Sequence, residues 1–475
     1  MRLLNKSKLF LKNSNYKDYS VALNAINVNL SKVEGFSLLV FVSIFFIGIF
    51  TFFPGAMTWD SLDQLRQARE GQYSNWQPPI MAILWNQFLV LPYGEGGMLI
   101  FHLFCLYSSC IILFFWAKQR SYKARFIFLL IPVLPWVVNF EFAIWKDVGL
   151  AFSWLLAIAL TLTFKPKRHI GQYSLMVVVF SLFLYGLLVR SNALFAAFAL
   201  LPFLVLCTYK FSLIKTFIIS SCSIALLFFT LPNLIIWGFD VTPQNNLSYI
   251  MLDDVVALRK DNDNFFSKEE MLKIEQCGIR KQNKVGVAFC LEQKFLFVKD
   301  QGYEQLKAEW LLRIQSEPFK YIKYRLSAFS TLLRIPAMDP YYPAEFRVRQ
   351  APYIHESPIA EKEKLAISLA RYIKSIRGTI SFIYKPYFWA VISAVLVFLL
   401  FKLRRFNPYP LYLLPISGLM YLLGYILTTP FPDFRYVYWT CIIATFSMIM
   451  ALCLWQERRN LSYIESEAEG ISGTI

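Results

Sequence analysis

The sequence predicts an all-α protein that crosses a membrane about ten times. Of its 475 residues, 57% are hydrophobic and only 17% are charged, whereas a soluble domain carries about 25% charged residues. The apolar residues come in blocks of about 17 to 24, the length that a helix needs to cross a bilayer. Short polar segments, many of them basic, separate these blocks.

Ten apolar blocks are long enough to be transmembrane helices. A further apolar block, Pro79 to Leu91, is too short to cross and is flanked by prolines, so we expect an interfacial helix in the first outside loop. The expected spans are 36–53, 97–117, 126–142, 148–164, 173–189, 193–209, 216–237, 386–401, 409–427 and 436–455.

These spans divide the chain into five parts. They are a basic leader (1–35), an N-terminal transmembrane bundle (36–237) with its first outside loop at 54–96, a long loop (238–385), C-terminal transmembrane helices (386–456) and a tail (457–475). The long loop is expected to be mostly helical, at 249–260, 268–276, 304–315 and 319–333. Asp253 and Asp254 lie on the first of these helices, where we expect solvated charges.

The distribution of Lys and Arg predicts the orientation. With a cytoplasmic N-terminus, the inside segments hold 20 of the 48 basic residues and the short outside segments hold five. The other 23 lie in the long loop, and long loops do not follow the charge rule. Both termini are therefore expected in the cytoplasm and the long loop outside it. The net charge of +17 matches an anionic inner leaflet and does not indicate nucleic acid.

Cysteine and histidine usage gives little sign of a metal site. Six of the eight cysteines fall in expected spans, where they serve as packing residues. Cys277 and Cys290 lie in the long loop, as either a disulfide or two free thiols. The three histidines are scattered, so we expect no zinc site.

The polar stretch Thr58–Pro79 follows the first expected span and carries two carboxylates. A short helix, Ser61–Glu70, would place Asp60 and Asp63 on adjoining faces, and Gly71 would end it. Carboxylates beside a membrane can take part in acid/base chemistry or bind a cation. The alternative is that Asp60 caps the helix and Asp63 is a solvated charge, and the local sequence leaves both open.

Three other outside turns carry charges as well. One holds Lys146 and Asp147, which also fit a snorkelling lysine paired with its neighbour. The next holds Arg190, which fits either a headgroup anchor or a phosphate ligand. The last holds Asp433 and Arg435. Because charges at the membrane edge are costly unless they face a polar cavity, four such turns on one side predict a site for an anionic, polar substrate.

The motifs resemble those of integral-membrane glycosyltransferases of the GT-C class, such as protein O-mannosyltransferases, lipid A aminoarabinose transferases and bacterial O-antigen-modifying transferases. Asp60, Gly71 and Pro78-Pro79 match the first outside loop of that class. Asp147 matches a second acid, and Arg435-Tyr436 matches an Arg-Tyr pair before a late span. Bacterial members read WDS, then HP, then KD, and Gln77 stands here where many of them have His. The likeness covers roughly the first 210 residues and the last 50.

The resemblance implies a sugar donor on polyprenyl phosphate and chemistry on the outer face of the bacterial cytoplasmic (inner) membrane. The acceptor it implies is O-antigen, lipid A, another envelope glycan or lipid, or protein. Asp60 would be the catalytic base or would hold a divalent cation. The resemblance therefore fixes no cofactor, and it does not identify the ligands of a metal ion. Arg190, Arg435 and Lys146 would neutralise the lipid phosphate. The substrate-binding residues expected are Asp63, Gln64, Trp76, Gln77, Lys146, Asp147, Arg190, Asn192, Asp433, Arg435 and Tyr436.

Three alternatives remain at this stage. An O-antigen ligase or polymerase shares the lipid-linked substrate and a large outside loop. A flippase or transporter would also gather charges, but it usually shows broken helices or an inverted repeat, and the charges here lie at one edge. A structural membrane partner without activity is the third.

Overall fold

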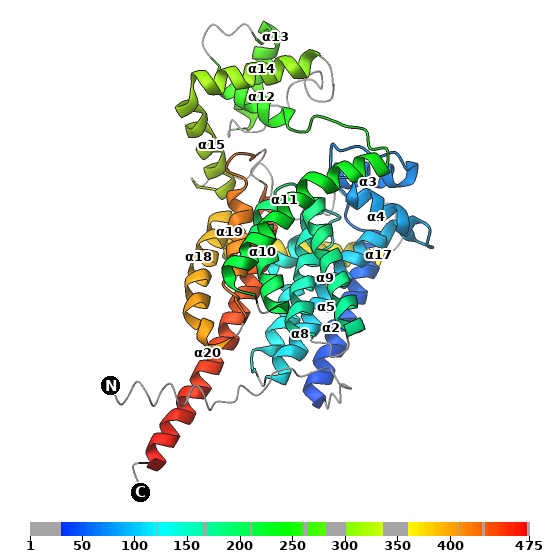
Figure 1. Cartoon of the computed structure of the whole chain (residues 1–475). Helices are drawn as coiled ribbons and strands as arrows, with labels where there is room; N and C mark the ends of the chain where they lie inside the picture. The colour runs from blue at the N-terminus through cyan, green and yellow to red at the C-terminus, as the bar shows by residue number, and fades with distance from the viewer. Residues whose placement is uncertain are drawn as a thin grey trace, which may run out of the picture.

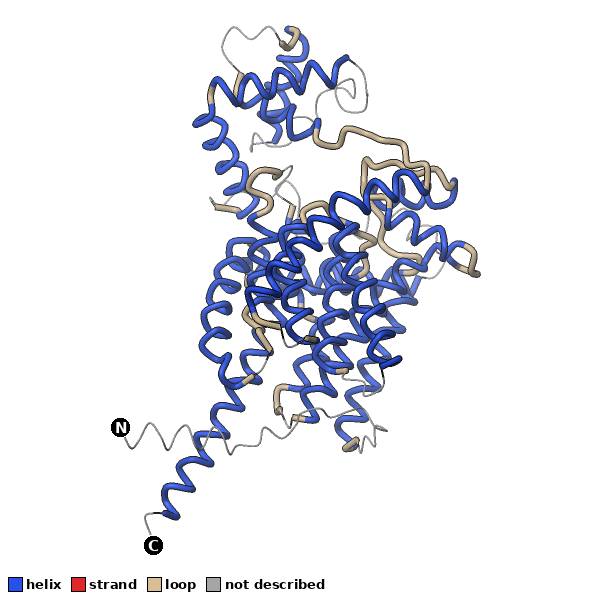
Figure 2. The backbone as a smooth tube through the Cα atoms, viewed as in Figure 1, coloured by secondary structure: helices blue, strands red, loops and turns tan. Residues whose placement is uncertain are grey.

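The computed structural model describes residues 30–120, 122–164, 169–209, 211–259, 265–281, 301–335, 360–407, 409–429 and 433–472. These residues form helices and connecting turns, and no β-strand occurs among them (Figure 2). Most of the predicted leader, residues 1–29, lies outside the described part of the chain, as does Cys290 of the predicted disulfide pair.

A bundle of helices forms the larger part of the molecule. Seven helical segments in the described residues are long and apolar enough to cross a membrane, so the protein is all-α with the composition of a membrane protein. They are α2 (Lys32–Phe52), η1 with α5 (Gly94–Gln119), α8 (Lys146–Thr163), α9 (His169–Val189), α11 (Leu213–Gly238), α18 with η7 (Pro386–Phe406), and η8 with the first part of α20 (Phe434–Arg459).

Three expected spans are shorter or interrupted. The segment 126–142 is not one helix but α6 (Arg125–Leu130), the 3₁₀ turn η2 (Ile131–Val133) and α7 (Pro135–Glu141). Pro132 and Pro135 explain the break, because proline lacks the amide donor and its ring clashes with the preceding turn. The segments 193–209 and 409–427 contain the shorter helices α10 (Ala193–Thr208) and α19 (Leu413–Leu423).

Helices α8 and α20 are the most buried of the spanning helices. Helix α8 packs against α5 and α9, and α20 (Tyr438–Ser472) packs against α8, α18 and α19. Helix α20 continues beyond the bundle at the end marked C (Figure 1). The helices α8 and α20 both begin at the other end of the bundle, away from the end marked C (Figure 1). The charged turns meet there.

A small helical unit, which we call the head, lies beyond that end of the bundle (Figure 1). It comprises α12 (Ser248–Ala257), α13 (Lys268–Lys281), α14 (Gln301–Ser316) and α15 (Pro318–Leu333). The first three share a core that includes Leu252, Val255 and Leu306. Helix α15 leads back to the bundle, where Arg334 donates a hydrogen bond of 3.0 Å to the Tyr384 carbonyl.

Neither Asp253 nor Asp254 is the solvated charge that the sequence suggested, because both are buried, with 4% and 0% of their surface exposed. The Asp254 carboxylate lies 2.5 Å from Nη2 of Arg325 on α15. Trp310 Nε1 also donates to it, at 2.8 Å. A buried carboxylate is tolerated because it is both paired and hydrogen-bonded. The ion pair joins α12 to α15, and the Trp310 bond adds α14. Together they hold the rest of the head to α15, the helix that leads back to the bundle.

Replacing Asp254 with Asn should destabilise the head by about 3 kcal/mol, because the buried Arg325 guanidinium would lose its counter-ion. Limited proteolysis of the full-length protein in detergent should show faster cleavage within the head. The control is Glu269→Gln, which removes an exposed ion pair with Lys273 and should change little. Equal protease resistance of the Asp254 and Glu269 variants would contradict the role given to the buried pair.

Helix α17 (Ala360–Thr379), which the sequence analysis did not anticipate, packs with the bundle. Its apolar face buries Ala366 and Ile373 in the large core. Tyr372 donates to the Val133 carbonyl at 3.1 Å, and so ties α17 to the interrupted segment between α6 and α7. The last part of the long loop is therefore joined to the bundle and not to the head.

Candidate functional site

The predicted short helix is present as α3 (Trp59–Glu70). Thr58 is its N-cap and forms a capping box with Ser61, so Asp60 is not the cap. Gly71 ends the helix with a φ of +66°, a left-handed conformation that glycine adopts without strain. Asp60 therefore lies in the first turn, where the helix dipole favours its negative charge but no capping hydrogen bond occupies it.

The chain before α3 is fixed to the chain before α8. Ala56 exchanges two backbone hydrogen bonds of 2.9 Å with this segment, one to the Phe142 carbonyl and one from the Ile144 amide. Ser61 Oγ donates to the Ile144 carbonyl at 2.7 Å, and Trp145 Nε1 donates to Thr58 Oγ1 at 3.0 Å. These contacts hold the first turn of α3 against the start of α8.

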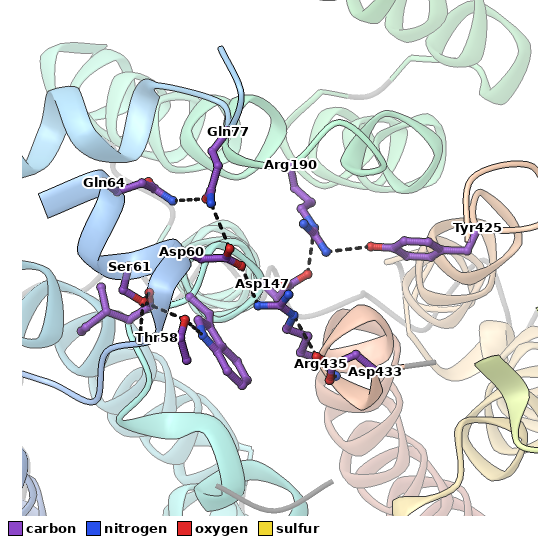
Figure 3. Close-up of polar contacts among 12 residues, drawn as sticks. Thr58, Asp60, Ser61, Gln64, Gln77, Asp147, Arg190, Tyr425, Asp433 and Arg435 are labelled. Carbon is purple, nitrogen blue, oxygen red and sulfur yellow. Dashed lines mark hydrogen bonds and ion pairs between the residues drawn. The ribbon is translucent and has the colours of Figure 1, made fainter. Parts of the chain in front are cut away.

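Asp60 lies between an arginine and a glutamine. Arg435, on η8 (Phe434–Val437), donates from Nη1 to Asp60 Oδ2 at 2.9 Å. Gln77 donates to the other carboxylate oxygen at 3.0 Å and in turn accepts a bond of 2.7 Å from Gln64 (Figure 3). The Asp60 side chain remains 37% exposed. It is therefore a positioned carboxylate that an outside molecule can reach.

Arg435 has further contacts behind Asp60. Its Nε lies 3.0 Å from Asp433 Oδ2, and its guanidinium lies 5.0 Å from the Trp145 ring centre and 5.3 Å from that of Tyr436. The guanidinium thus bridges two carboxylates beside two aromatic rings. Planar, delocalised arginine suits this arrangement better than lysine.

A second ion pair lies deeper in the bundle. Arg190, in the turn between α9 and α10, places Nε 2.9 Å from Asp147, whose side chain is 2% exposed. Tyr421 donates to the same carboxylate at 3.2 Å. Arg190 also donates to the Tyr425 hydroxyl at 3.2 Å (Figure 3). The guanidinium also lies 4.9 Å from the centre of the Tyr436 ring.

Lys146 differs from the two arginines. The pairing with Asp147 that the sequence left open as an alternative is absent, because Asp147 is paired with Arg190. Lys146 is only 9% exposed, yet among the described residues no carboxylate oxygen lies within 4 Å of its ammonium. A buried, unpaired ammonium is costly. An anion that entered the site would therefore be a favourable partner for the protonated form of Lys146.

The surrounding cations keep Asp60 ionised. Burial works to raise the pKa of Asp60, but the charges of Arg435 and Lys146 outweigh it and hold that pKa at about 2, below the ordinary 3.8. At neutral pH Asp60 is therefore an ionised carboxylate, able to accept a hydrogen bond from a hydroxyl group.

An open cleft of about 430 Å³ borders Asp60 on the outer side of α3. Trp59, Asp63, Trp76 and Gln77 line it together with Gln244, which comes from the chain leading into the head. Of the other predicted site residues, Asp63 pairs with the exposed Arg66 at 2.7 Å. Asn192 lies away from the cleft, where its amide donates to Thr428 at 3.4 Å.

The structure thus brings most of the predicted residues into one layered site. Asp60, Gln64 and Gln77 form the layer beside the cleft, and Asp147 and Arg190 form the inner layer. The guanidinium groups of Arg435 and Arg190 both lie over the Tyr436 ring, which joins the two layers. Sequence reasoning missed Trp145, Tyr421 and Tyr425, although the two tyrosines stand one helical turn apart near the end of an expected span.

A metal ion would have two carboxylates available at the cleft, Asp60 and Asp63, one turn apart on α3. Each already accepts a bond from an arginine. Among the described residues, no group of three or more His, Cys, Asp or Glu side chains is placed to hold a metal. A cation at Asp60 would therefore take the place of the Arg435 guanidinium.

Comparison of the chain with protein-family models, with curated proteins and with solved structures gave no match.

Proposed function

We propose that the protein is a membrane glycosyltransferase. It moves a sugar from a polyprenyl-phosphate donor to a cell-envelope glycan, such as O-antigen or another part of lipopolysaccharide, on the outer face of the cytoplasmic membrane. One observation carries this proposal: an ionised carboxylate, Asp60, faces an open cleft, while Arg435, Lys146 and Arg190 lie behind it. This arrangement places a base for a hydroxyl group next to cations for a phosphate.

The proposed reaction is a single displacement at the anomeric carbon of the donor sugar. The acceptor hydroxyl forms a new bond to that carbon, and the bond from the carbon to the phosphate oxygen breaks. Asp60 takes the hydroxyl proton, and polyprenyl phosphate leaves with the electron pair of the broken bond. Such a step needs one carboxylate within hydrogen-bond reach of the acceptor.

The leaving phosphate gains negative charge as the bond breaks, so cations placed near it stabilise the transition state. Lys146, which has no carboxylate oxygen within 4 Å among the described residues, would supply a third positive charge in its protonated form. Arg190 and Arg435 each supply a planar guanidinium that can bind two phosphate oxygens at once. The aromatic side chains beside them exclude water and so strengthen these interactions.

Arg435 would have two roles in this mechanism. While it pairs with Asp60, the pKa of Asp60 is about 2 and the carboxylate is a weak base. When a phosphate draws the guanidinium away, Asp60 loses the partner that most stabilises its charged form, and it becomes a stronger base. Donor binding would thus activate the carboxylate that accepts the proton.

The proposal requires the head and the cleft to lie outside the cytoplasm, with both termini inside. We therefore expect Lys268→Cys, in the exposed part of α13, to react with an impermeant maleimide in right-side-out vesicles. Arg404→Cys, directly after the end of α18 on the predicted cytoplasmic side, should react only in inside-out vesicles. The labelled sites can be assigned by mass spectrometry, and the reverse pattern would contradict this orientation.

The activity itself can be tested with purified protein in proteoliposomes. A set of polyprenyl-phosphate sugars (glucose, galactose, mannose and arabinose) serves as donors, and the envelope polysaccharide of the host serves as acceptor. We expect one donor to be consumed, with release of polyprenyl phosphate and incorporation of labelled sugar into the polysaccharide. Movement of the intact donor across the bilayer, without transfer, would instead identify a flippase.

A further inference from the structure

The cleft beside Asp60 has the chemistry of a carbohydrate subsite. It combines two indole rings, Trp59 and Trp76, with the side chains of Asp63, Gln77 and Gln244. Aromatic faces pack against the C–H faces of sugar rings, while amides and carboxylates form hydrogen bonds with hydroxyl groups, which both donate and accept. A volume of about 430 Å³ is in the range of small-ligand pockets.

Trp59 is the most informative of these residues. It immediately precedes Asp60 on α3, and its side chain is 88% exposed. Among the described residues, no other aromatic ring or cation stacks on it. The rest of α3 packs normally, with Leu65 and Ala68 buried. A bare indole one residue from the proposed base can therefore contact whatever molecule brings its hydroxyl to Asp60.

The head side of the cleft is held in place by backbone pairing. Thr242 donates to the Tyr73 carbonyl at 2.8 Å and accepts from the Asn75 amide at 3.1 Å. Trp76 packs against Tyr249 of α12, with ring centres 4.9 Å apart. These contacts place Gln244 on the cleft wall opposite α3. The chain leading into the head thus completes the cleft, which gives the head a role at the site.

The charges in the cleft select against an anionic ligand. Asp60 and Asp63 both line it, and the one cation among the described residues of its wall, Arg66, is paired with Asp63 and Glu70. The other cations of the site, Arg435, Lys146 and Arg190, do not line the cleft and lie behind Asp60. A negatively charged acceptor would meet carboxylates first, whereas an uncharged, hydroxyl-rich one would meet hydrogen-bonding groups and aromatic faces.

We propose that this cleft is the acceptor subsite and that it takes an uncharged glycan, whose sugar ring stacks on Trp59 and whose hydroxyl group points at Asp60. The inference rests on the proposed transferase function and narrows its acceptor to neutral polysaccharide, in place of acidic glycan or the phosphorylated lipid portion of lipopolysaccharide. Trp76 and Gln244 form the opposite wall.

The test measures glycan binding by full-length protein in nanodiscs, without donor. Envelope polysaccharide from the host is separated by ion exchange into neutral and acidic pools, and each is titrated while binding is followed by interferometry. We expect the neutral pool to bind and the acidic pool not to. Trp59→Ala should weaken binding by about three- to tenfold, the contribution of one aromatic contact. Trp59→Phe should restore part of it.

The matched control is Trp237→Ala, which removes another exposed indole, 85% accessible at the end of α11 and outside the cleft. This variant should bind glycan like the unmodified protein. Stronger binding of the acidic pool, no binding of the neutral pool, or equal affinity in the Trp59 and Trp237 variants would each overturn the inference. Neutral-pool binding in a protein that consumes no lipid-linked donor would retain the glycan site and refute only the transferase.

Discussion

Replacing Asp60 with Asn should abolish most sugar transfer while leaving the protein folded and in the membrane. A general base contributes about 10²–10⁴ to a rate, and an amide cannot accept the proton from the hydroxyl group. The substitution keeps the shape of the side chain and one of the two hydrogen bonds that Asp60 accepts, because an amide has a single acceptor oxygen. Arg435 would retain Asp433 as a counter-ion, and Thr58 would still cap α3, so we expect little loss of stability.

The measurement is kcat/KM for labelled-sugar transfer, with the melting temperature recorded on the same samples. Asp63→Asn is the control, because Asp63 lines the same cleft but forms an exposed ion pair with Arg66, and its loss should have a small effect. Normal transfer by the Asp60 variant would remove Asp60 from the mechanism. A large fall in melting temperature would point to a structural role instead.

The pH dependence provides a second check on Asp60. Its pKa in the folded protein, about 2, is below the ordinary 3.8, so the carboxylate is ionised at any pH above that value. Its contribution to stability is accordingly present above pH 3.8 and is lost as the pH falls toward 2. A loss of kcat/KM between pH 5 and 7 in the free enzyme must then arise from another group.

The sequence was sufficient to predict an all-α membrane protein, and its charged turns pointed to most of the charged residues that meet beside the first turns of α3 and α8. Long apolar blocks can be stable only in a membrane or a large core, so an all-α membrane protein followed from composition alone. The clustering of charged turns followed from the cost of leaving charges at a membrane edge. Helix α3 was recognisable because its polar pattern ends at Gly71, a residue suited to the left-handed C-cap.

The pairing within the site was beyond sequence reasoning, since it depends on how each helix is rotated and how far it is shifted. Asp147 has Lys146 as its neighbour in the chain, yet it pairs with Arg190 from another turn. Asp253 and Asp254 were both expected in solvent, but both are buried, and Asp254 pairs with Arg325. The residues that cover this face of α12 come from distant parts of the chain, which the local sequence does not show.

Replacing Arg435 with Lys should reduce transfer by about 10²-fold, the effect of losing one well-placed donor to a developing negative charge. Lysine preserves the positive charge, but its ammonium cannot contact Asp60 and Asp433 with a rigid planar group, nor bind two phosphate oxygens in parallel. We expect the KM for the polyprenyl-phosphate donor to rise and kcat to fall, while membrane insertion and glycan binding in the cleft stay unchanged.

The matched control is Arg66→Lys, because Arg66 also lines the cleft and also bridges two carboxylates, Asp63 and Glu70, but does so at the surface. That variant should transfer sugar at a nearly normal rate, since exposed ion pairs contribute little. Donor consumption and glycan binding are measured separately on both variants. If the Arg435 variant keeps full activity, or if it loses glycan binding but keeps its affinity for the donor, then Arg435 does not contact the phosphate, and Lys146 and Arg190 remain as the cations that would hold it.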